Sequence, residues 1–237
     1  VGLGTLEYWH KPSVDVVVST DPKASMHLQE SWLIVHDQEG LGSALQQELM
    51  ARGHHVIGLP VEKTDHLRQY LPQGRPVRVV FAATGQDAFR EDEVMPEALR
   101  RGIHDLLRLA QALNDVMEER KDISLQVITR GAFETDRYST PINPVKRALT
   151  GMRMVMGNEM NSCRCRFLGM PAQVTAVDRD TLIRQLEAEI SAEEILAIRG
   201  LSICAPRLER VHEEHHRANL SLTAANEGLC LVPTRPG

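Results

Sequence analysis

Residues 31–59, SWLIVHDQEGLGSALQQELMARGHHVIGL, decide the fold of this chain. The first run, residues 32–35, is uniformly apolar, as is typical of a strand buried on both faces of a parallel sheet. A glycine turn follows, and the apolar residues after it recur with the spacing of one helical face: Leu41, Ala44, Leu45, Leu49 and Met50. Gly53 is expected to end this helix, and residues 55–59 to form the next strand. The stretch therefore predicts the strand, turn, helix and strand that open a Rossmann-type unit.

The turn after the first strand differs from a working dinucleotide site. Such a site needs bare backbone N–H groups that hold a pyrophosphate at the helix N-terminus. Here Asp37 and Glu39 place two carboxylates directly before Gly40 and Gly42. At about 4 Å, each like-charge contact costs about 1 kcal/mol in water and several times more near a protein surface. We interpret these four residues as a degenerate turn and expect no NADPH or NADH to bind; the alternative is a Rossmann-like protein with a different ligand.

Composition excludes several classes of protein. The net charge of −5, without a basic block, argues against nucleic acid as a partner. No apolar run approaches the roughly 20 residues that span a bilayer, and no signal-peptide pattern opens the sequence. The four cysteines include no CxxC pair, which argues against zinc and favours reduced thiols in a cytoplasmic protein.

Strand-like and helix-like stretches alternate along the rest of the chain. Further strands are expected at residues 77–82, 123–129, 163–170 and 201–205. Further helices are expected at residues 66–71, from Pro96, from a cap at Asn143 (with Val155 among its inward residues), from a cap at Asp180, and at residues 193–198. This order predicts an α/β protein, a Rossmann-like fold with a mostly parallel sheet flanked by helices.

The tyrosines argue against reductase catalysis. A short-chain reductase uses a tyrosine as acid, with a lysine four residues later on the same helical face to lower its pKa. In this chain that offset pairs Tyr8 with Pro12, Tyr70 with Gly74 and Tyr138 with Ile142. This chain alone is therefore not expected to catalyse such a reduction, and a free-standing Rossmann-fold nucleotide-dependent enzyme is the disfavoured alternative.

Two further motifs have structural interpretations. His212, Glu213 and His216 match the zinc-binding pattern HExxH, but their surroundings are polar, so a zinc hydrolase is the weaker alternative and a solvated linker is expected. Residues 129–132 follow a strand, where open α/β sheets bind ligands; without a phosphate turn they are expected to organise a loop. The cations of the next helix, Lys146, Arg147 and Arg153, are expected on its exposed face.

A series of segments resembles, in order and spacing, the structural subdomain of a polyketide synthase ketoreductase. The resemblance covers roughly residues 5–210 and includes the pseudo-ketoreductases of methyltransferase-containing modules. The segments are WLIVHDQEGLGSALQQELMARGHHV, VRVVFAATGQDA, LLRLAQAL, SLQVITRGA, RALTGMRMVMGNEMNSCRCRFLGM and LAIRGLSICAPRL.

The resemblance implies a non-catalytic role. Ketoreductases of this family have two Rossmann-like halves, of which the first is truncated, binds no cofactor and supports the second. The second half carries NADPH and the Ser-Tyr-Lys catalytic residues, and this chain stops before it. Residues 226–237 resemble the opening of an enoylreductase domain. The implied partners are therefore the catalytic half, an enoylreductase or methyltransferase domain and, indirectly, an acyl carrier protein.

The resemblance also divides the chain. Residues 1–30 are expected to be a linker with a docking strand, in which Leu6, Tyr8 and Trp9 contact the catalytic half. Residues 31–210 are expected to form the truncated Rossmann-like subdomain, and residues 211–237 a linker into the next domain.

Overall fold

The computed structural model describes residues 6–10, 30–36, 40–82, 100–133, 135, 143–160, 163–190 and 194–209. The chain divides into two compact units, residues 9–206 and residues 1–8 with 207–237. The strands are β1 (Leu6–His10), β2 (Ser31–His36), β3 (His55–Pro60), β4 (Val77–Phe81), β5 (Ile123–Arg130), β6 (Arg164–Met170), β7 (Ile195–Arg199) and β8 (Ser202–Glu209). The helices are α1 (Leu41–Ala51), α2 (Leu67–Tyr70), α4 (Asp105–Met117), α5 (Pro144–Glu159) and α6 (Ala176–Glu187), with a 3-10 turn η1 (Val61–His66) and a π turn η2 (Arg100–His104).

The strands form one sheet in the order β1-β8-β7-β6-β5-β4-β2-β3. From β3 to β7 neighbouring strands run parallel, and β8 is antiparallel to β7. The chain passes from β2 outward to β3 and then returns to β4 on the other side of β2, which is the reversal that defines a Rossmann sheet. A full unit would place one more strand beyond β3, but the chain returns after only η1 and α2. The predicted truncated Rossmann-like fold is confirmed.

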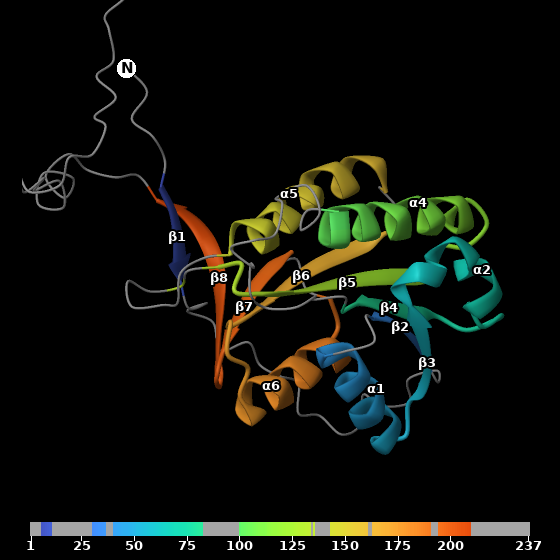
Figure 1. Ribbon diagram of the computed structural model, residues 1–237, viewed down its shortest axis with the longest axis horizontal. Coiled ribbons are helices and arrows are strands. Elements are labelled where there is room, and N and C mark those ends of the chain that lie inside the picture. Colours follow the sequence, from blue (N-terminus) through green and yellow to red (C-terminus); the bar gives the residue numbers. More distant parts are fainter. Residues whose placement is uncertain are drawn as a thin grey trace, which may run out of the picture. The chain divides into compact units, whose positions relative to one another are not determined.

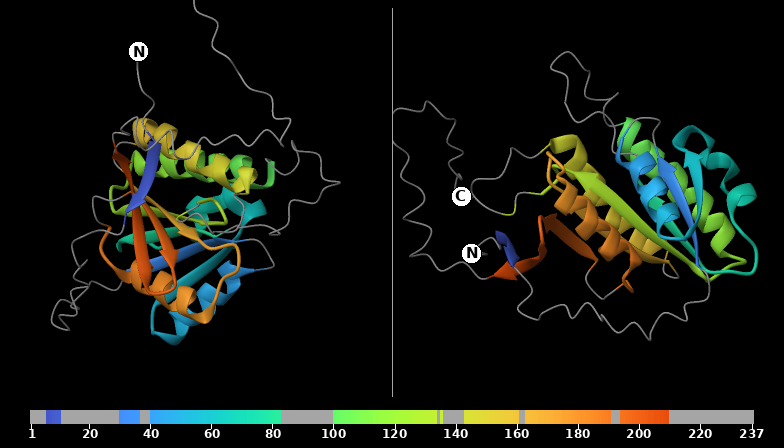
Figure 2. Two further views of the ribbon diagram at one scale, coloured as in Figure 1. Left: turned by 90° about the vertical axis from the view of Figure 1, so that its left-hand side faces the viewer. Right: turned by 90° about the horizontal axis from the view of Figure 1, so that it is seen from below.

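Helices cover both faces of the sheet within residues 9–206 (Figure 1). α4 and α5 lie on one face, and α1 and α6 lie on the other, as the turned views also show (Figure 2). Strand residues alternate between the two layers, so Leu33 and Val35 pack toward α4 whereas Trp32 and Ile34 pack toward α1 and α6. The uniformly apolar run in β2 is thus explained by burial on both faces.

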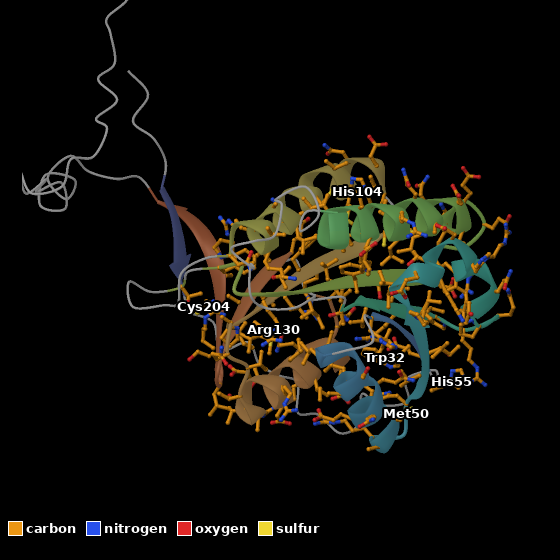
Figure 3. The ribbon with its side chains drawn as sticks, viewed as in Figure 1. Trp32, Met50, His55, His104, Arg130 and Cys204 are labelled. Atoms are coloured by element: carbon orange, nitrogen blue, oxygen red, sulfur yellow. The ribbon has the colours of Figure 1, made fainter. Side chains whose placement is uncertain are left out.

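The predicted apolar face of α1 is correct except at Met50. Leu41, Leu45 and Leu49 are buried, but Met50 is 54% exposed and lies at the outer end of the helix (Figure 3). Met50 follows Leu45 by five residues, which places it about 140° around the helix from that side chain.

The secondary structure predicted for two segments near the end of the sheet is wrong. Residues 193–198 were expected to be helical, but β7 is a strand with a buried centre, because its place in the sheet overrides the helix propensity of its residues. Leu201 was expected to begin the last strand, yet it is 75% exposed in the turn before β8. β8 also continues past Pro206, which is possible because its pairing with β7 ends at Cys204.

Two helix predictions also need correction. α6 is capped by Thr175, which forms a capping box with Asp178, and not by Asp180. Val155 was expected to face inward from α5 but is 51% exposed. The predicted cap of α5 is confirmed, since the Asn143 side chain accepts hydrogen bonds from the backbone N–H groups of Val145 and Lys146.

The C-terminus of α6 is fastened to the sheet by polar side chains of three adjacent strands. Arg78 of β4 donates through Nη1 to the carbonyl oxygens of Leu186 (2.6 Å) and Ala188 (2.8 Å). Gln126 of β5 donates to Leu186 O at 3.2 Å. Arg166 of β6 donates to Gln126 Oε1 at 2.7 Å and to the carbonyl oxygen of Gln185. The last carbonyl groups of a helix have no hydrogen-bond partner within the helix and carry partial negative charge. The three side chains supply the missing donors, and the two arginines also supply positive charge.

Arg166 keeps its charge despite its burial. Desolvation lowers the pKa of Arg166 to about 10, and the nearby positive charge of Arg78 contributes to this shift. The guanidinium is therefore still protonated at neutral pH, where it faces helix carbonyls and an amide oxygen. Arg78 also lies over the ring of Trp32, with Cζ 5.4 Å from the ring centroid, and pairs with Glu30.

Replacing Leu45 by Ala should lower the free energy of unfolding by about 2–5 kcal/mol, because the side chain is fully buried under α1. Gln47→Ala, an exposed position of the same helix, should change it by no more than about 0.5 kcal/mol. Urea unfolding followed by circular dichroism measures both values. Equal losses would contradict the assigned buried face.

Candidate functional site

The topological switch point lies where β2 and β4 end and α1 begins. In open α/β sheets, ligands bind in the crevice at this point. Here a Cβ atom added to Gly42 would lie 2.3 Å from His36 Cβ and 3.3 Å from Ala82 Cβ. The first turn of α1 therefore packs directly against both strand ends, and only glycine fits. Packing alone accounts for Gly42, so this glycine is not by itself an indication of a phosphate site.

The rest of the predicted degenerate turn is described only in part. Gly40 is the N-cap residue of α1, with φ of 138°, and makes no side-chain cap. Asp37 and Glu39 lie outside the described residues, so the exclusion of phosphate by their carboxylates stays a prediction.

Residues 129–132 organise a loop, as predicted. Gly131 has φ of 60°, which favours glycine. Its N–H donates to Met170 O at 3.0 Å, and its carbonyl oxygen accepts from Asn143 N at 2.9 Å. Arg130, at the end of β5 (Figure 3), donates to Ala172 O at 2.9 Å. These bonds tie the ends of β5 and β6 to the start of α5.

The cations of α5 do not lie on an exposed face, contrary to the prediction. Lys146 is only 8% exposed. Arg147 lies over the ring of Phe133, with Cζ 5.2 Å from the ring centroid, and Arg153 pairs with Glu194. The first turn of α5 packs against the loop after β5, so Lys146 and Arg147 lie along neighbouring structure, whereas Arg153, two turns later, reaches Glu194 just before β7.

Phe133 closes the carboxyl edge of the sheet above β6, a role that no local pattern in the sequence indicates. A Cβ atom on Gly169 would lie 2.1 Å from Phe133 Cδ2, so the ring packs directly on the strand. Phe133 clusters with Ala132, Ala197 and Cys204. Arg199 donates to the carbonyl oxygen of Phe133 at 2.6 Å and fixes its backbone. Apolar packing therefore fills this part of the edge.

Asp178 fastens the turn between β7 and β8 to α6. Its carboxylate accepts hydrogen bonds from Thr175 N (2.8 Å), Thr175 Oγ1 (2.6 Å) and Gly200 N (2.6 Å). Burial by itself raises the pKa of Asp178, but these hydrogen bonds and the charge of Arg199 outweigh it, so the net pKa is lowered.

The described residues supply few groups suited to catalysis. Tyr70 packs against the apolar core on the α4 side, and the side chains of Tyr8 and Tyr138 lie outside the description. Burial raises the pKa of the Cys163 thiol to about 11 and raises that of Cys165 as well, so neither is a ready nucleophile.

The part of the chain that the structure describes holds no cluster of side chains suited to a metal ion and no helix suited to crossing a membrane. No group of three or more His, Cys, Asp or Glu side chains there is placed to hold a metal ion. His212, Glu213 and His216 lie beyond that part, so their interpretation as a linker stays a prediction. None of the helices described has the length and apolar character needed to cross a bilayer.

Asp178→Asn should lower the free energy of unfolding at pH 7 by about 1–3 kcal/mol, because hydrogen bonds to a buried carboxylate are lost. The pKa of Asp178 is lowered in the fold, so its contribution is present above the unfolded value of about 3.9 and is lost as pH falls through the lower folded value. The difference in free energy of unfolding between the unchanged protein and Asp178→Asn should therefore shrink below about pH 4.

Asp180→Asn is the matched control on the same helix. Its carboxylate is half exposed and pairs only at the surface, so the change should cost no more than about 1 kcal/mol. A difference for Asp178→Asn that stays constant from neutral pH to pH 3 would contradict the role assigned to the carboxylate.

Solved structures show what this fold is similar to. A C2-type ketoreductase from a modular polyketide synthase matches with a TM-score of 0.66 and 18% identity, over 88% of this chain and 44% of that chain. A structure of A-type ketoreductases from a modular polyketide synthase matches with a TM-score of 0.61 and 22% identity, over 88% and 42%. A short-chain dehydrogenase from Rhodopseudomonas palustris matches with a TM-score of 0.53 and 11% identity, over 72% and 98%.

No protein-family model matches the chain, and no curated protein matches it. At such low identities the structural similarity establishes the Rossmann-like fold alone. The chain spans less than half the length of the ketoreductases to which it is similar.

Proposed function

We propose that this chain is the non-catalytic structural half of a modular polyketide synthase ketoreductase, or of a pseudo-ketoreductase. Its role is to stabilise and position an NADPH-dependent reductase half and neighbouring domains. The observation that carries this proposal is the extent of the match, which takes in 88% of this chain but only 44% of the C2-type ketoreductase. A chain of that extent fits one half of a two-part reductase.

Side-chain packing at the carboxyl edge of the sheet supports a non-catalytic role. Gly42 is required by packing against His36 and Ala82, and Phe133 fills the edge above β6. The tyrosine and lysine spacing of a reductase is missing from the sequence. The proposal is therefore that NADPH belongs to the partner half and that this chain binds no cofactor.

The docking strand of the proposal is β1. It ends the strand order beside β8, and an edge strand offers its unpaired backbone groups to another chain. Leu6 and Tyr8 alternate with Trp9 along it, so both faces of the strand carry an apolar or aromatic side chain. Their contact with the reductase half is proposed from this pattern, since these side chains lie outside the description.

The remaining assignments follow from the resemblance. Residues 1–30 would hold the linker and docking strand, residues 31–210 the structural subdomain, and residues 211–237 the linker to an enoylreductase. A methyltransferase domain is the alternative neighbour, an acyl carrier protein is an indirect partner, and the location is the cytoplasm.

A second candidate is a free-standing Rossmann-fold enzyme. The observation in its favour is that the match to the Rhodopseudomonas palustris dehydrogenase covers 98% of that protein. The missing tyrosine and lysine pair speaks against it. The two candidates differ in whether this chain, alone, oxidises NADPH with a ketone substrate.

The test uses a β-ketoacyl thioester, NADPH, and the reductase half of the same synthase. We expect little soluble protein or NADPH oxidation from the reductase half alone, and rescue of both when residues 1–237 are added. A version without residues 1–12 should rescue poorly, because it lacks β1. A version without residues 226–237 is the matched control and should rescue fully.

Each other outcome has a definite meaning. Full activity of the reductase half alone would contradict the supporting role. NADPH oxidation by residues 1–237 alone would favour the free-standing enzyme. Equal rescue by the two shortened versions would remove the docking role from β1. A pseudo-ketoreductase has no reductase half, so no activity can be measured. The measurement is then a pull-down that asks whether residues 1–237 bind the methyltransferase or enoylreductase domain.

A further inference from the structure

A hollow of about 410 Å³ lies at the amino edge of the sheet, opposite the switch point. It opens where β4, β5 and β6 begin and where the chain leaves the C-terminus of α6. Its polar lining includes Glu30, Arg78, Lys121, Ser124, Arg164 and Glu189. The volume lies in the range of small-molecule sites, which is about 300–1,000 Å³. We name this feature the amino-edge hollow.

Three of the lining residues form a row across adjacent strands. Arg78 is paired in register with Ser124, and Ser124 is paired with Arg164. Neighbouring strands are about 4.8 Å apart, and residues paired in register point to the same face. A hydroxyl group therefore lies between two guanidinium-bearing residues on the face that α6 covers.

Arg78 is a fixed cation in this row. Its Nε donates to Glu30 Oε2 at 2.6 Å, while Nη1 is held by the carbonyl groups at the end of α6. The residue is 9% exposed, so its position is set by the fold. By contrast, the Arg164 side chain is 72% exposed, and its contact with Glu189 is a loose 3.8 Å. Arg164 can therefore turn toward a ligand at little cost.

The charges around the hollow favour an anion. The lining itself carries three cations and three carboxylates, and Arg120 beside it adds one further positive charge; the lining groups are Arg78, Lys121 and Arg164 with Glu30, Asp122 and Glu189. Two of these carboxylates are already engaged. Glu30 pairs with Arg78, and Asp122 accepts two hydrogen bonds from Arg120, at 2.9 and 2.7 Å.

We propose that the amino-edge hollow binds a soluble small molecule through a carboxylate or phosphate group. Ser124 donates its hydroxyl hydrogen to the oxyanion, Arg164 supplies a forked pair of N–H donors, and Arg78 and Lys121 supply positive charge nearby. The hydroxyl of Ser124 makes no hydrogen bond within the part of the chain that the structure describes. The site lies at the opposite edge from the one that binds cofactors in Rossmann folds and is independent of the proposed scaffold role.

The experiment uses residues 1–237 and two probes, inorganic phosphate and malonate, each titrated against chloride at constant ionic strength. Thermal unfolding and calorimetry report binding. We expect at least one probe to raise the melting temperature saturably and to release or take up heat with the same midpoint. The probe with the lower midpoint identifies the group, phosphate or carboxylate, that the hollow prefers.

Three variants test the location. Arg164→Glu, at an exposed side chain that folding does not need, should weaken binding by at least about tenfold, and Ser124→Ala by about threefold or more. Arg68→Glu changes the same charge at an exposed position on α2 and should leave the midpoint unchanged. Absence of saturation with both probes would overturn the proposal. An unchanged midpoint in Arg164→Glu and Ser124→Ala would overturn it equally, because binding would then lie elsewhere.

Discussion

The arrangement of the sheet and its last strands depends on the fastening of α6 by Arg78, Gln126 and Arg166. Two charged side chains lie inside a parallel sheet whose strands are otherwise apolar, and an unsatisfied buried charge is strongly destabilising. Here the end of α6 provides the acceptors, so cation and helix terminus stabilise each other. The other end of α6 carries Asp178, which holds the turn into β8. One helix thus links the middle of the sheet to its antiparallel end.

The sequence predicted the parts of the fold that follow from periodicity. The run in β2, the face of α1 and the alternation of strands with helices all depend on local pattern. The burial of Arg78 and Arg166 was not predicted, because an arginine in a strand usually indicates an exposed position. Their signal was present in VRVV and CRCRF, where single cations interrupt apolar runs. The capping box of α6 was also readable, since Thr175 precedes Asp178 by three residues.

The candidate site was predictable in position but not in detail. The reversal of strand order had to place the switch point beside the glycine turn, and it does. Sequence reasoning could not foresee that Gly42 packs on His36, because that contact joins a helix to the end of a strand. Nor could it foresee Phe133, whose ring meets Gly169, 36 residues later, only after both strands are paired. Contacts between distant segments depend on tertiary structure and carry no local signal.

The proposed role is that of a Rossmann unit that supports a reductase without holding a nucleotide. Direct titration with NADPH, followed by nucleotide fluorescence and calorimetry, tests it most simply, with an active short-chain reductase as the positive control. If the proposed role is correct, residues 1–237 give no saturable signal up to about 1 mM nucleotide. Saturable binding with a dissociation constant of about 10 μM or lower would contradict it.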